Sequence, residues 1–297
     1  MSIIASVKPS KLIKLIDSIP IKGSSMSLAY STTLEKIFVL DYNSKAIESY
    51  CINNLSLVKE IQLDPLIEQP EIICAKNDTF FIGSDESNKI YYLDDSFKIR
   101  NQFSSDDYKS CSAITCDPKL DTSFIYTSHE QENKVSKWDY ENGKIVMSVE
   151  IQRPGSLCCN ESLVFVASNG HYRTDMNSKI VERLGLSQIY VLNEKTLKVE
   201  RTIQIKNWID LLSINVINSK IYVTAFTFDD CKRSRNRSLL EFNSEFKLQS
   251  VVELEQSSFA FDVCLVDSKV VLLSLSDEDV QNLQIYNLAT KNKWYFF

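Results

Sequence analysis

The chain has 297 residues, of which 44% are apolar and 24% are charged, and this apolar share is too high for a disordered protein. Its formal net charge of −6, from 33 basic and 39 acidic residues, argues against a dedicated nucleic-acid binder, which would usually be basic. No apolar run approaches the roughly 20 residues that cross a bilayer, so we expect no membrane span.

The N-terminus and the cysteines indicate the compartment. The apolar patch between Met1 and Lys8 is too short for the hydrophobic region of a signal peptide. No closely spaced cysteine pair is joined to a second pair or to histidines, so we expect buried thiols and no zinc site. We therefore predict a cytoplasmic or nuclear protein without a cofactor. The eight cysteines are Cys51, Cys74, Cys111, Cys116, Cys158, Cys159, Cys231 and Cys264.

Two kinds of short apolar run alternate along the chain, and both are rich in β-branched and aromatic residues, which favours buried strands. The first kind occurs at Lys36–Asp41, Thr79–Ser84, Ser123–Ser128, Leu163–Ser168, Lys220–Ala225 and Lys269–Ser274. The second kind occurs at Ala46–Tyr50, Lys89–Leu93, Lys134–Trp138, Gln188–Leu192, Ser238–Phe242 and Gln284–Leu288.

The spacing of these runs indicates one module repeated six times. Counted between the second residues of the runs, the steps from a second run to the next first run are 33, 34, 29, 32 and 31 residues. The steps from a first run to its own second run are 10, 10, 11, 25, 18 and 15 residues. One interval is nearly constant and the other grows only in the last three modules, which places insertions in one particular loop.

Each constant interval holds two further strand-like pieces. An outer piece follows the second run, as in Leu57–Ile61, and the Asn142-Gly143 pair supports a hairpin turn before such a piece. A run of small and apolar residues then precedes the next module, as in Ser25–Tyr30. Four antiparallel strands in about 40 residues are typical of a propeller blade, so we predict an all-β, six-bladed β-propeller in a single domain, 1–297. The expected blades are 23–63, 68–104, 110–152, 154–205, 208–254, and 258–297 together with 11–16.

Individual blades resemble known propeller families. The segments Asp85–Asp94 and Ser187–Val199 resemble blades of the YVTN and NHL β-propellers. Lys134–Asp139, with its Trp138-Asp139 pair and the Asn-Gly-Lys that follows, resembles a WD-repeat blade. The Gly-His dipeptides of WD repeats are absent, so we expect the hydrogen-bonded tetrad of that family to be absent too.

Two segments compete for the outer strand of the last blade. Trp294–Phe297 has the spacing of an outer strand, and Lys11–Ile16 lies where an outer strand should precede the first module. Many propellers let an N-terminal strand complete the last blade, because this removes an open sheet edge. We expect Lys11–Ile16 to join blade 6, and the sequence leaves open which segment is outermost.

The insertions fall in the consecutive blades 4, 5 and 6. In a propeller these loops share a face with the connections between blades, so we expect them to crowd one sector of that face. The blade 5 insertion carries four basic residues, and arginine suits bidentate recognition of carboxylate or phosphate. The blade 6 insertion is acidic, with Asp277, Glu278 and Asp279.

These features predict a non-catalytic scaffold that binds a protein or acidic peptide through this face, with Tyr172, Phe226 or Phe228 as anchors. The open alternative is that the charged loops are only solvated or pair with each other, which contributes little. Nucleic acid is disfavoured by the acidic total. The candidate contact residues are Tyr172, Arg173, Lys179, Arg183, Phe228, Lys232, Arg233, Arg235 and Arg237.

An enzyme is the second class of function. Six-bladed propellers of the gluconolactonase type hold a divalent metal in the central channel, and similarity to them would imply a metal-dependent lactonase or hydrolase. The candidate ligands here are Glu71, Asp210 and Asp262, since carboxylates suit hard cations. They do not fall at equivalent places in the repeat, and no nucleophile motif or P-loop is present. Of the two histidines, we expect His129 to lie exposed in a short loop of blade 3 and His171 in the blade 4 insertion.

Overall fold

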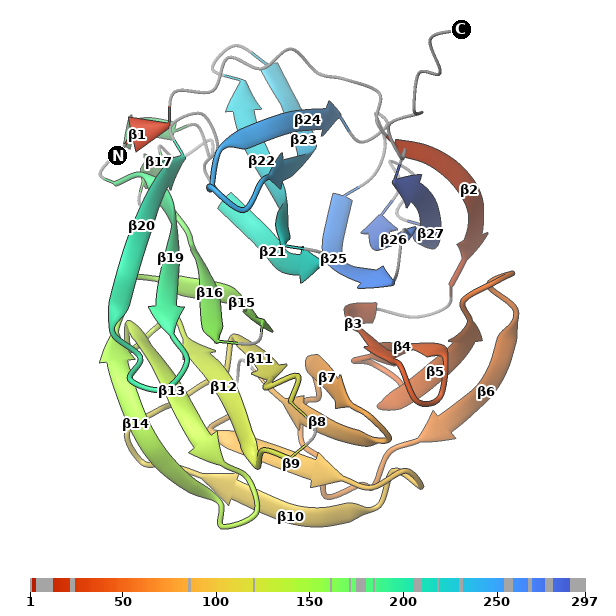
Figure 1. Ribbon diagram of the computed structural model, residues 1–297. Helices are drawn as coiled ribbons and strands as arrows, with labels where there is room; N and C mark the ends of the chain where they lie inside the picture. The colour runs from red at the N-terminus through yellow and green to blue at the C-terminus, as the bar shows by residue number, and fades with distance from the viewer. Residues whose placement is uncertain are drawn as a thin grey trace, which may run out of the picture.

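The computed structural model contains six four-stranded antiparallel sheets arranged around a central channel (Figure 1). No helix occurs in the part of the chain that the structure describes, and none of it could therefore cross a membrane as a helix. The described residues are 2–3, 13–21, 25–84, 87–119, 121–160, 162–170, 172–174, 180–183, 185–205, 210–217, 219–229, 232–253, 259–266, 269–275 and 280–288.

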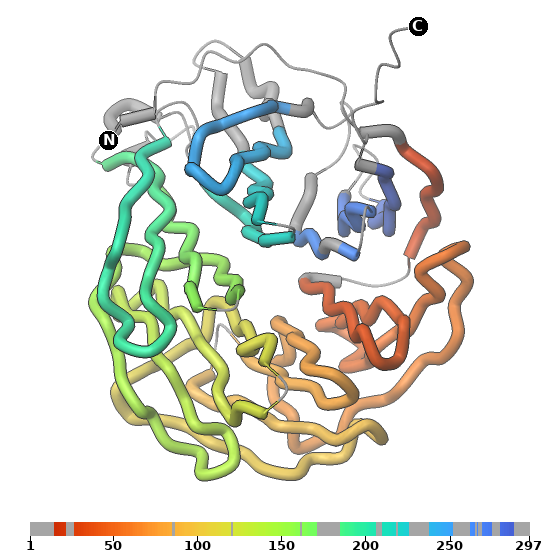
Figure 2. The backbone as a smooth tube through the Cα atoms, in the orientation of Figure 1, coloured from red at the N-terminus to blue at the C-terminus, as the bar shows by residue number. Residues whose placement is uncertain are grey.

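The sheets follow one another around the ring in chain order, as the colours of Figure 2 show. The first three blades contain β3 (Ser25–Ser31), β4 (Lys36–Asp41), β5 (Ala46–Cys51) and β6 (Leu57–Gln62); β7 (Ile72–Lys76), β8 (Thr79–Gly83), β9 (Lys89–Leu93) and β10 (Ile99–Ser104); and β11 (Ala113–Cys116), β12 (Phe124–His129), β13 (Lys134–Asp139) and β14 (Lys144–Glu150). The last three contain β15 (Pro154–Asn160), β16 (Leu163–Ser168), β19 (Ser187–Asn193) and β20 (Val199–Ile205); β21 (Asp210–Ile217), β22 (Lys220–Asp229), β23 (Lys232–Phe242) and β24 (Leu248–Glu253); and β25 (Phe259–Val266), β26 (Lys269–Leu275), β27 (Gln281–Leu288) and β2 (Ile13–Pro20).

The predicted six-bladed propeller is therefore confirmed, and the two kinds of apolar run form the second and third strand of each blade. Their apolar character is nearly continuous because each blade is covered on both faces by its neighbours. In β4, Ile37 and Val39 pack in the cluster between blades 6 and 1, whereas Phe38 and Leu40 pack between blades 1 and 2. Alternate side chains of a strand point to opposite faces, so one strand serves two interfaces.

An N-terminal strand closes the ring. β2 pairs antiparallel with β27, from Ile13 opposite Leu288 to Pro20 opposite Asn282. Ile21 N–H then donates to the carbonyl of Gln281 at 2.9 Å. The predicted strand at Lys11–Ile16 is thus found slightly later in the chain, and within the described residues it is the outer strand of blade 6. The competing segment Trp294–Phe297 lies outside the described residues.

Three short strands are added to blade 4. β17 (Tyr172–Thr174) and β18 (Ile180–Arg183) form a two-stranded sheet of their own inside the predicted insertion. β1 (Ser2–Ile3) pairs in parallel with the outer strand β20, through Ser2 opposite Gln204 and Ile3 opposite Ile205. The sequence did not predict this fifth strand, which puts the start of the chain on blade 4 (Figure 1).

Candidate functional site

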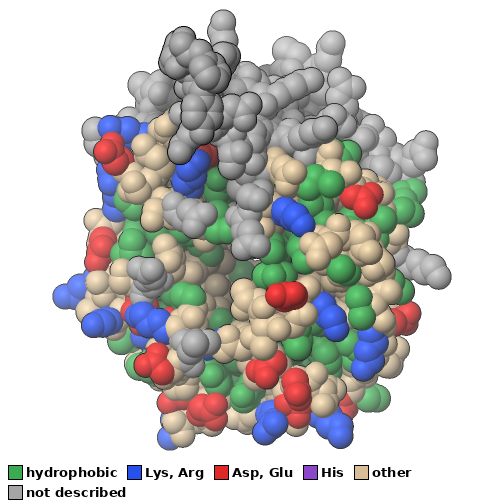
Figure 3. Space-filling model, turned by 45° about the vertical axis from the view of Figure 1, so that its right-hand side comes forward, with side chains coloured by type: hydrophobic (Ala, Val, Ile, Leu, Met, Phe, Trp, Pro, Cys, Tyr) green, Lys and Arg blue, Asp and Glu red, His purple; other side chains and the backbone are tan. Residues whose placement is uncertain are grey.

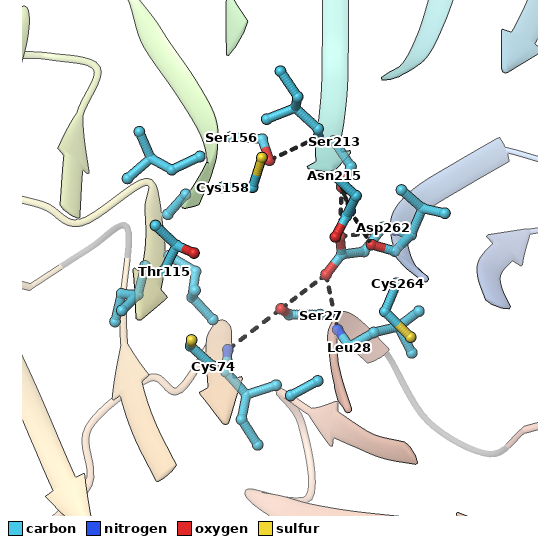
Figure 4. Close-up of a pocket in the computed structure, with 18 of the residues that line it drawn as sticks. Ser27, Leu28, Cys74, Thr115, Ser156, Cys158, Ser213, Asn215, Asp262 and Cys264 are labelled. Carbon is cyan, nitrogen blue, oxygen red and sulfur yellow. Dashed lines mark hydrogen bonds between the residues drawn. The ribbon is translucent and has the colours of Figure 1, made fainter. Parts of the chain in front are cut away.

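The innermost strands of the six blades line a central channel with a volume of about 640 Å³ (Figure 4). Ser27, Ser213 and Asp262 occupy equivalent places in blades 1, 5 and 6, because each pairs with the fifth residue of the strand that follows. Two of these three equivalent positions carry a small hydroxyl side chain, and the third carries a carboxylate. Among these three equivalent positions, Asp262 therefore carries the one charged side chain.

The carboxylate of Asp262 joins three blades. One of its oxygens accepts hydrogen bonds from Ser27 Oγ at 3.1 Å and from Leu28 N–H at 2.8 Å. The other accepts from Ser213 Oγ at 3.0 Å and from Val263 N–H at 2.8 Å. Burial raises the pKa of Asp262, although all four hydrogen bonds act in the opposite direction. With four donors around its two oxygens, the carboxylate already has its full set of partners.

The same kind of bond continues to the neighbouring blades. Ser27 Oγ accepts from Ile73 N–H of blade 2 at 3.3 Å, and Ser156 Oγ of blade 4 accepts from Ile214 N–H of blade 5 at 3.1 Å. Figure 4 shows these bonds running from strand to strand around the channel. These hydrogen bonds link the inner strands of adjacent blades, so they stabilise the ring.

The three candidate metal ligands do not form a set. Glu71 and Asp262 line the channel, whereas Asp210 begins β21, pairs with Phe226, and is not among the residues that line the channel. Across the described residues, no group of three His, Cys, Asp or Glu side chains is placed to hold a metal ion. Because the oxygens of Asp262 already bind protein donors, nothing in this geometry favours the metal-dependent lactonase.

The prediction that His129 is exposed is wrong. The side chain is 2% exposed at the end of β12, and its ring stacks on Tyr108 with the ring centres 3.8 Å apart. Nδ1 lies 2.6 Å from the carbonyl of Ser110, and Nε2 lies 2.8 Å from Thr127 Oγ1, which also accepts from Trp138 Nε1 at 2.9 Å. Strand β12 continues one residue beyond the predicted run, and this carries His129 into the blade.

Blade 3 thus contains a hydrogen-bonded chain from Trp138 through Thr127 to His129, where we expected no such network. The histidine comes from the second strand and not from a Gly-His dipeptide, which explains why the motif did not reveal it. Burial lowers the pKa of His129 to about 4, so the ring is neutral at pH 7. A neutral ring can donate through Nδ1 to Ser110 and accept at Nε2 from Thr127.

The blade 5 insertion is a continuation of the sheet. β22 and β23 have 10 and 11 residues, whereas the corresponding strands β4 and β5 of blade 1 have 6 each. The added length pairs Phe226 with Arg237, Phe228 with Arg235 and Asp229 with Lys232. We call residues 226–229 and 232–237 the basic hairpin.

The blade 4 insertion brings two of the candidate residues together. Tyr172 pairs with Arg183, and Arg173 pairs with Glu182, in the β17–β18 sheet. Lys179 lies outside the described residues, as do His171 and the acidic residues of the blade 6 insertion at 277–279.

A polar cleft of about 380 Å³ lies between blades 3 and 4 at the base of the blade 4 insertion. Arg153 lies in its wall, with Nε and Nη2 donating to one oxygen of Glu130 at 3.1 and 2.8 Å and Nη1 donating to the carbonyl of Gly170 at 2.6 Å. These bonds tie the blade 3 turn to the start of the insertion. The cleft could not be predicted from the sequence, because its residues belong to ordinary turns and strand ends. Other lining residues are Asn133, Gln152, Asn169, Gln188 and Tyr190.

The fold is similar to WD40 β-propellers. The chain aligns with the WD40 domain of Pan2 from Neurospora crassa with a TM-score of 0.61 and 10% identity, over 94% of this chain and 96% of that one. It aligns with the WD40 propeller domain of Doa1 with a TM-score of 0.61 and 12% identity, over 91% and 80% of the two chains. Hydrazine synthase from Kuenenia stuttgartiensis gives a TM-score of 0.62 and 11% identity, over 84% and 76%.

At 10–12% identity these likenesses show the fold alone. No protein-family model matches the sequence, and no curated protein sequence matches it either. The chain is therefore a six-bladed β-propeller whose fold is similar to WD40 domains, and its resemblance to YVTN, NHL and WD-repeat blades stays a prediction.

Proposed function

We propose that this propeller is a non-catalytic scaffold that binds an acidic segment of a protein partner through the basic hairpin of blade 5 and the adjoining insertion of blade 4. The observation that carries the proposal is the extension of β22 and β23 beyond the length of a blade. The inner strand β21 pairs with β22 only as far as Phe226, and the outer strand β24 pairs with β23 only from Ser238, so the four-stranded blade does not require the pairing of residues 227–229 with 232–236. Long surface segments of defined composition more often serve binding.

The composition of the hairpin suits an acidic partner. Lys232 to Arg237 reads Lys-Arg-Ser-Arg-Asn-Arg, so the hairpin has four basic residues against one acid, Asp229, in a chain whose net charge is −6. On the side of the molecule shown in Figure 3, basic and acidic side chains are interspersed over the described surface, and neither sign forms a large patch. A local concentration of positive charge steers an acidic partner to one place and fixes its orientation.

The register adds aromatic residues to this surface. Residues that pair directly across two strands share a face of the sheet, and so do residues two apart on one strand. The backbone register pairs Phe226 with Arg237 and Phe228 with Arg235, so aromatic and basic positions alternate together along the hairpin. Arginine forms paired hydrogen bonds to carboxylates, and aromatic residues supply apolar contact area, so the combination is typical of protein recognition.

The blade 4 insertion supports the same location. In a four-stranded antiparallel blade, the connection between the second and third strands lies on the same face as the connection to the next blade. The basic hairpin, the β17–β18 sheet and the turn around Arg153 therefore belong to one face. A cleft of about 380 Å³ in this region has room for a side chain or two of a bound peptide.

The cysteines support a reducing compartment. None of the seven cysteines in the described residues forms a disulfide. Unpaired thiols are the rule in the cytoplasm and nucleus, where disulfides are kept reduced. We therefore expect the partner to be a cytoplasmic or nuclear protein.

The test compares two triple variants. Arg233→Glu, Arg235→Glu and Arg237→Glu together reverse the charge of the hairpin. Lys59→Glu, Lys144→Glu and Lys198→Glu change the net charge equally at exposed positions outside the hairpin. Binding is followed by fluorescence anisotropy of a labelled glutamate-rich peptide, with a lysine-rich peptide and a single-stranded DNA of equal length as competing probes.

We expect the wild type to bind the glutamate-rich peptide and the hairpin variant to bind at least about tenfold more weakly, because charge reversal replaces attraction with repulsion. The control variant should stay within about twofold of wild type at physiological salt, where distant charges are screened. Equal loss in both variants, or stronger binding of the DNA, would overturn the proposal.

A further inference from the structure

Two cysteines from neighbouring blades face each other beside the channel. Cys74 lies on β7 of blade 2 and Cys116 on β11 of blade 3, and their sulfur atoms are 3.0 Å apart. Neither is in a disulfide. A disulfide bond is about 2.0 Å long, so the two sulfurs need to approach by only about 1 Å for a bond to form.

Both side chains lie where such a movement is feasible and where a small oxidant has access. Cys74 lines the channel, and Figure 4 labels it beside Thr115 of the neighbouring strand. Cys116 is half-buried and packs, together with Cys74, on the apolar cluster between blades 2 and 3. A molecule the size of hydrogen peroxide can enter a channel of about 640 Å³ and meet Cys74 first.

The other channel cysteines provide a contrast. Cys158, Cys159 and Cys264 also line the channel, on blades 4 and 6. In the described part of the chain, none of the three has a sulfur contact like the one between Cys74 and Cys116. Cys158 and Cys159 are adjacent on one strand, so their side chains point to opposite faces. Cys74 is therefore the channel cysteine with a partner sulfur at 3.0 Å, and Cys158 and Cys264 serve as controls.

We propose that Cys74 and Cys116 form a reversible disulfide between blades 2 and 3 when the protein meets a hydroperoxide. The Cys74 thiol gives up its proton and its sulfur attacks one peroxide oxygen; the O–O bond breaks, the leaving hydroxide takes up that proton as the first water, and Cys74 becomes a sulfenic acid. The Cys116 sulfur then attacks the Cys74 sulfur; the S–S bond forms, the S–O bond breaks, and the leaving hydroxide takes up the Cys116 proton as the second water. Two electrons pass from the two thiols to hydrogen peroxide, which is reduced to two waters.

The reduced state is stable without an oxidant. Burial, together with the neighbouring Cys74, raises the pKa of the Cys116 thiol well above its ordinary value. The thiolate is the reactive form of cysteine, so Cys116 stays a thiol at neutral pH, and Cys74, which lines the channel, is the first of the two to react with an oxidant. A thiol reductant reverses the bond by exchange.

The bond has a measurable consequence for stability. It joins residues 42 positions apart, and linking residues so separated removes many conformations from the unfolded chain. We expect oxidation to raise the melting temperature by roughly 5–10 °C, and reduction to restore the original value. This proposal does not depend on the basic hairpin or on the proposed partner.

The test treats the purified full-length chain with hydrogen peroxide in molar excess. Peptide mapping without reduction should then find Cys74 linked to Cys116 with the loss of two hydrogens, and dithiothreitol should remove the link. Cys74→Ala and Cys116→Ala should each abolish both the link and the rise in melting temperature. Cys264→Ala, a matched substitution in the same channel, should keep both.

The mapping on the wild type is decisive whatever the stability of the variants. A dominant link between other cysteines, such as Cys116 with Cys159, would overturn the proposal. So would sulfenic, sulfinic or sulfonic acid at Cys74 without a link. A rise in melting temperature that persists in Cys74→Ala would contradict the assignment of the effect to this pair.

Discussion

At the scale of single residues, the hydrogen bonds of blade 3 determine the protonation of His129. Trp138 donates to Thr127, Thr127 can donate to His129, and His129 donates from its other nitrogen to the carbonyl of Ser110. A proton added at Nε2 would remove the acceptor that Thr127 uses and would place a charge in a buried site. Both effects keep the ring neutral.

We predict that protonation of His129 destabilises the protein in acid. The unfolded chain binds a proton at the ordinary histidine pKa near 6.5, whereas the folded protein binds it only near pH 4. Between these values the unfolded state holds more protons, so the free energy of unfolding falls as the pH drops from 6.5 to 4, by about 3 kcal/mol in total.

Nuclear magnetic resonance measures this directly, because the chain has only two histidines and His171→Gln leaves the signal of His129 alone. The ring signal should stay in its neutral position down to about pH 5. A midpoint near 6.5 in the folded protein would contradict the buried chain of hydrogen bonds.

At the scale of elements, β2 is the outer strand that completes blade 6 and closes the ring. It covers the outer edge of β27, and Ile19 and Ile21 pack in or against the apolar cluster between blades 6 and 1. Without β2 that edge would present unpaired N–H and C=O groups, which is a template for association with another chain. β1 pairs only two residues of β20, so its contribution should be much smaller.

Two truncations separate these contributions. Removal of residues 2–21 should lower the melting temperature by at least about 10 °C and cause self-association, because it removes a paired strand and part of a core cluster. Removal of residues 2–12 leaves β2 in place and should change the melting temperature by less than about 3 °C. Differential scanning calorimetry and sedimentation velocity measure both effects. Equal behaviour of the two truncations would show that β2 does not close the ring.

At the scale of the whole molecule, six apolar clusters alternate with six blades. Each cluster takes residues from two adjacent blades, and the sixth joins blade 6 to blade 1. The repeat spacing predicts this ring well, because a strand buried on both faces requires a continuous apolar run that is visible in the sequence. The second strands β4, β16, β22 and β26 begin at the predicted residues.

Features that depend on distant contacts could not be predicted in the same way. His129 follows Thr127-Ser128 and resembles a turn residue, and its burial depends on contacts with Tyr108 and Ser110, which lie about 20 residues earlier in the chain. The sequence of the basic hairpin resembles a loop, because it is rich in polar and charged residues such as Lys and Asn, which are depleted in strands. In the structure the pairing of β22 with β23 continues from the blade into this segment. The parallel pairing of β1 with β20 has no local signal at all.

Hydrogen–deuterium exchange of the full chain with a bound glutamate-rich peptide tests most directly whether the basic hairpin is the docking surface of the propeller. Peptide binding should slow exchange in residues 226–229 and 232–237, with smaller protection in β17 and β18. Exchange in the inner strands β7, β11 and β25 should not change. Protection confined to those inner strands or to the outer strands, with none in the hairpin, would contradict the account.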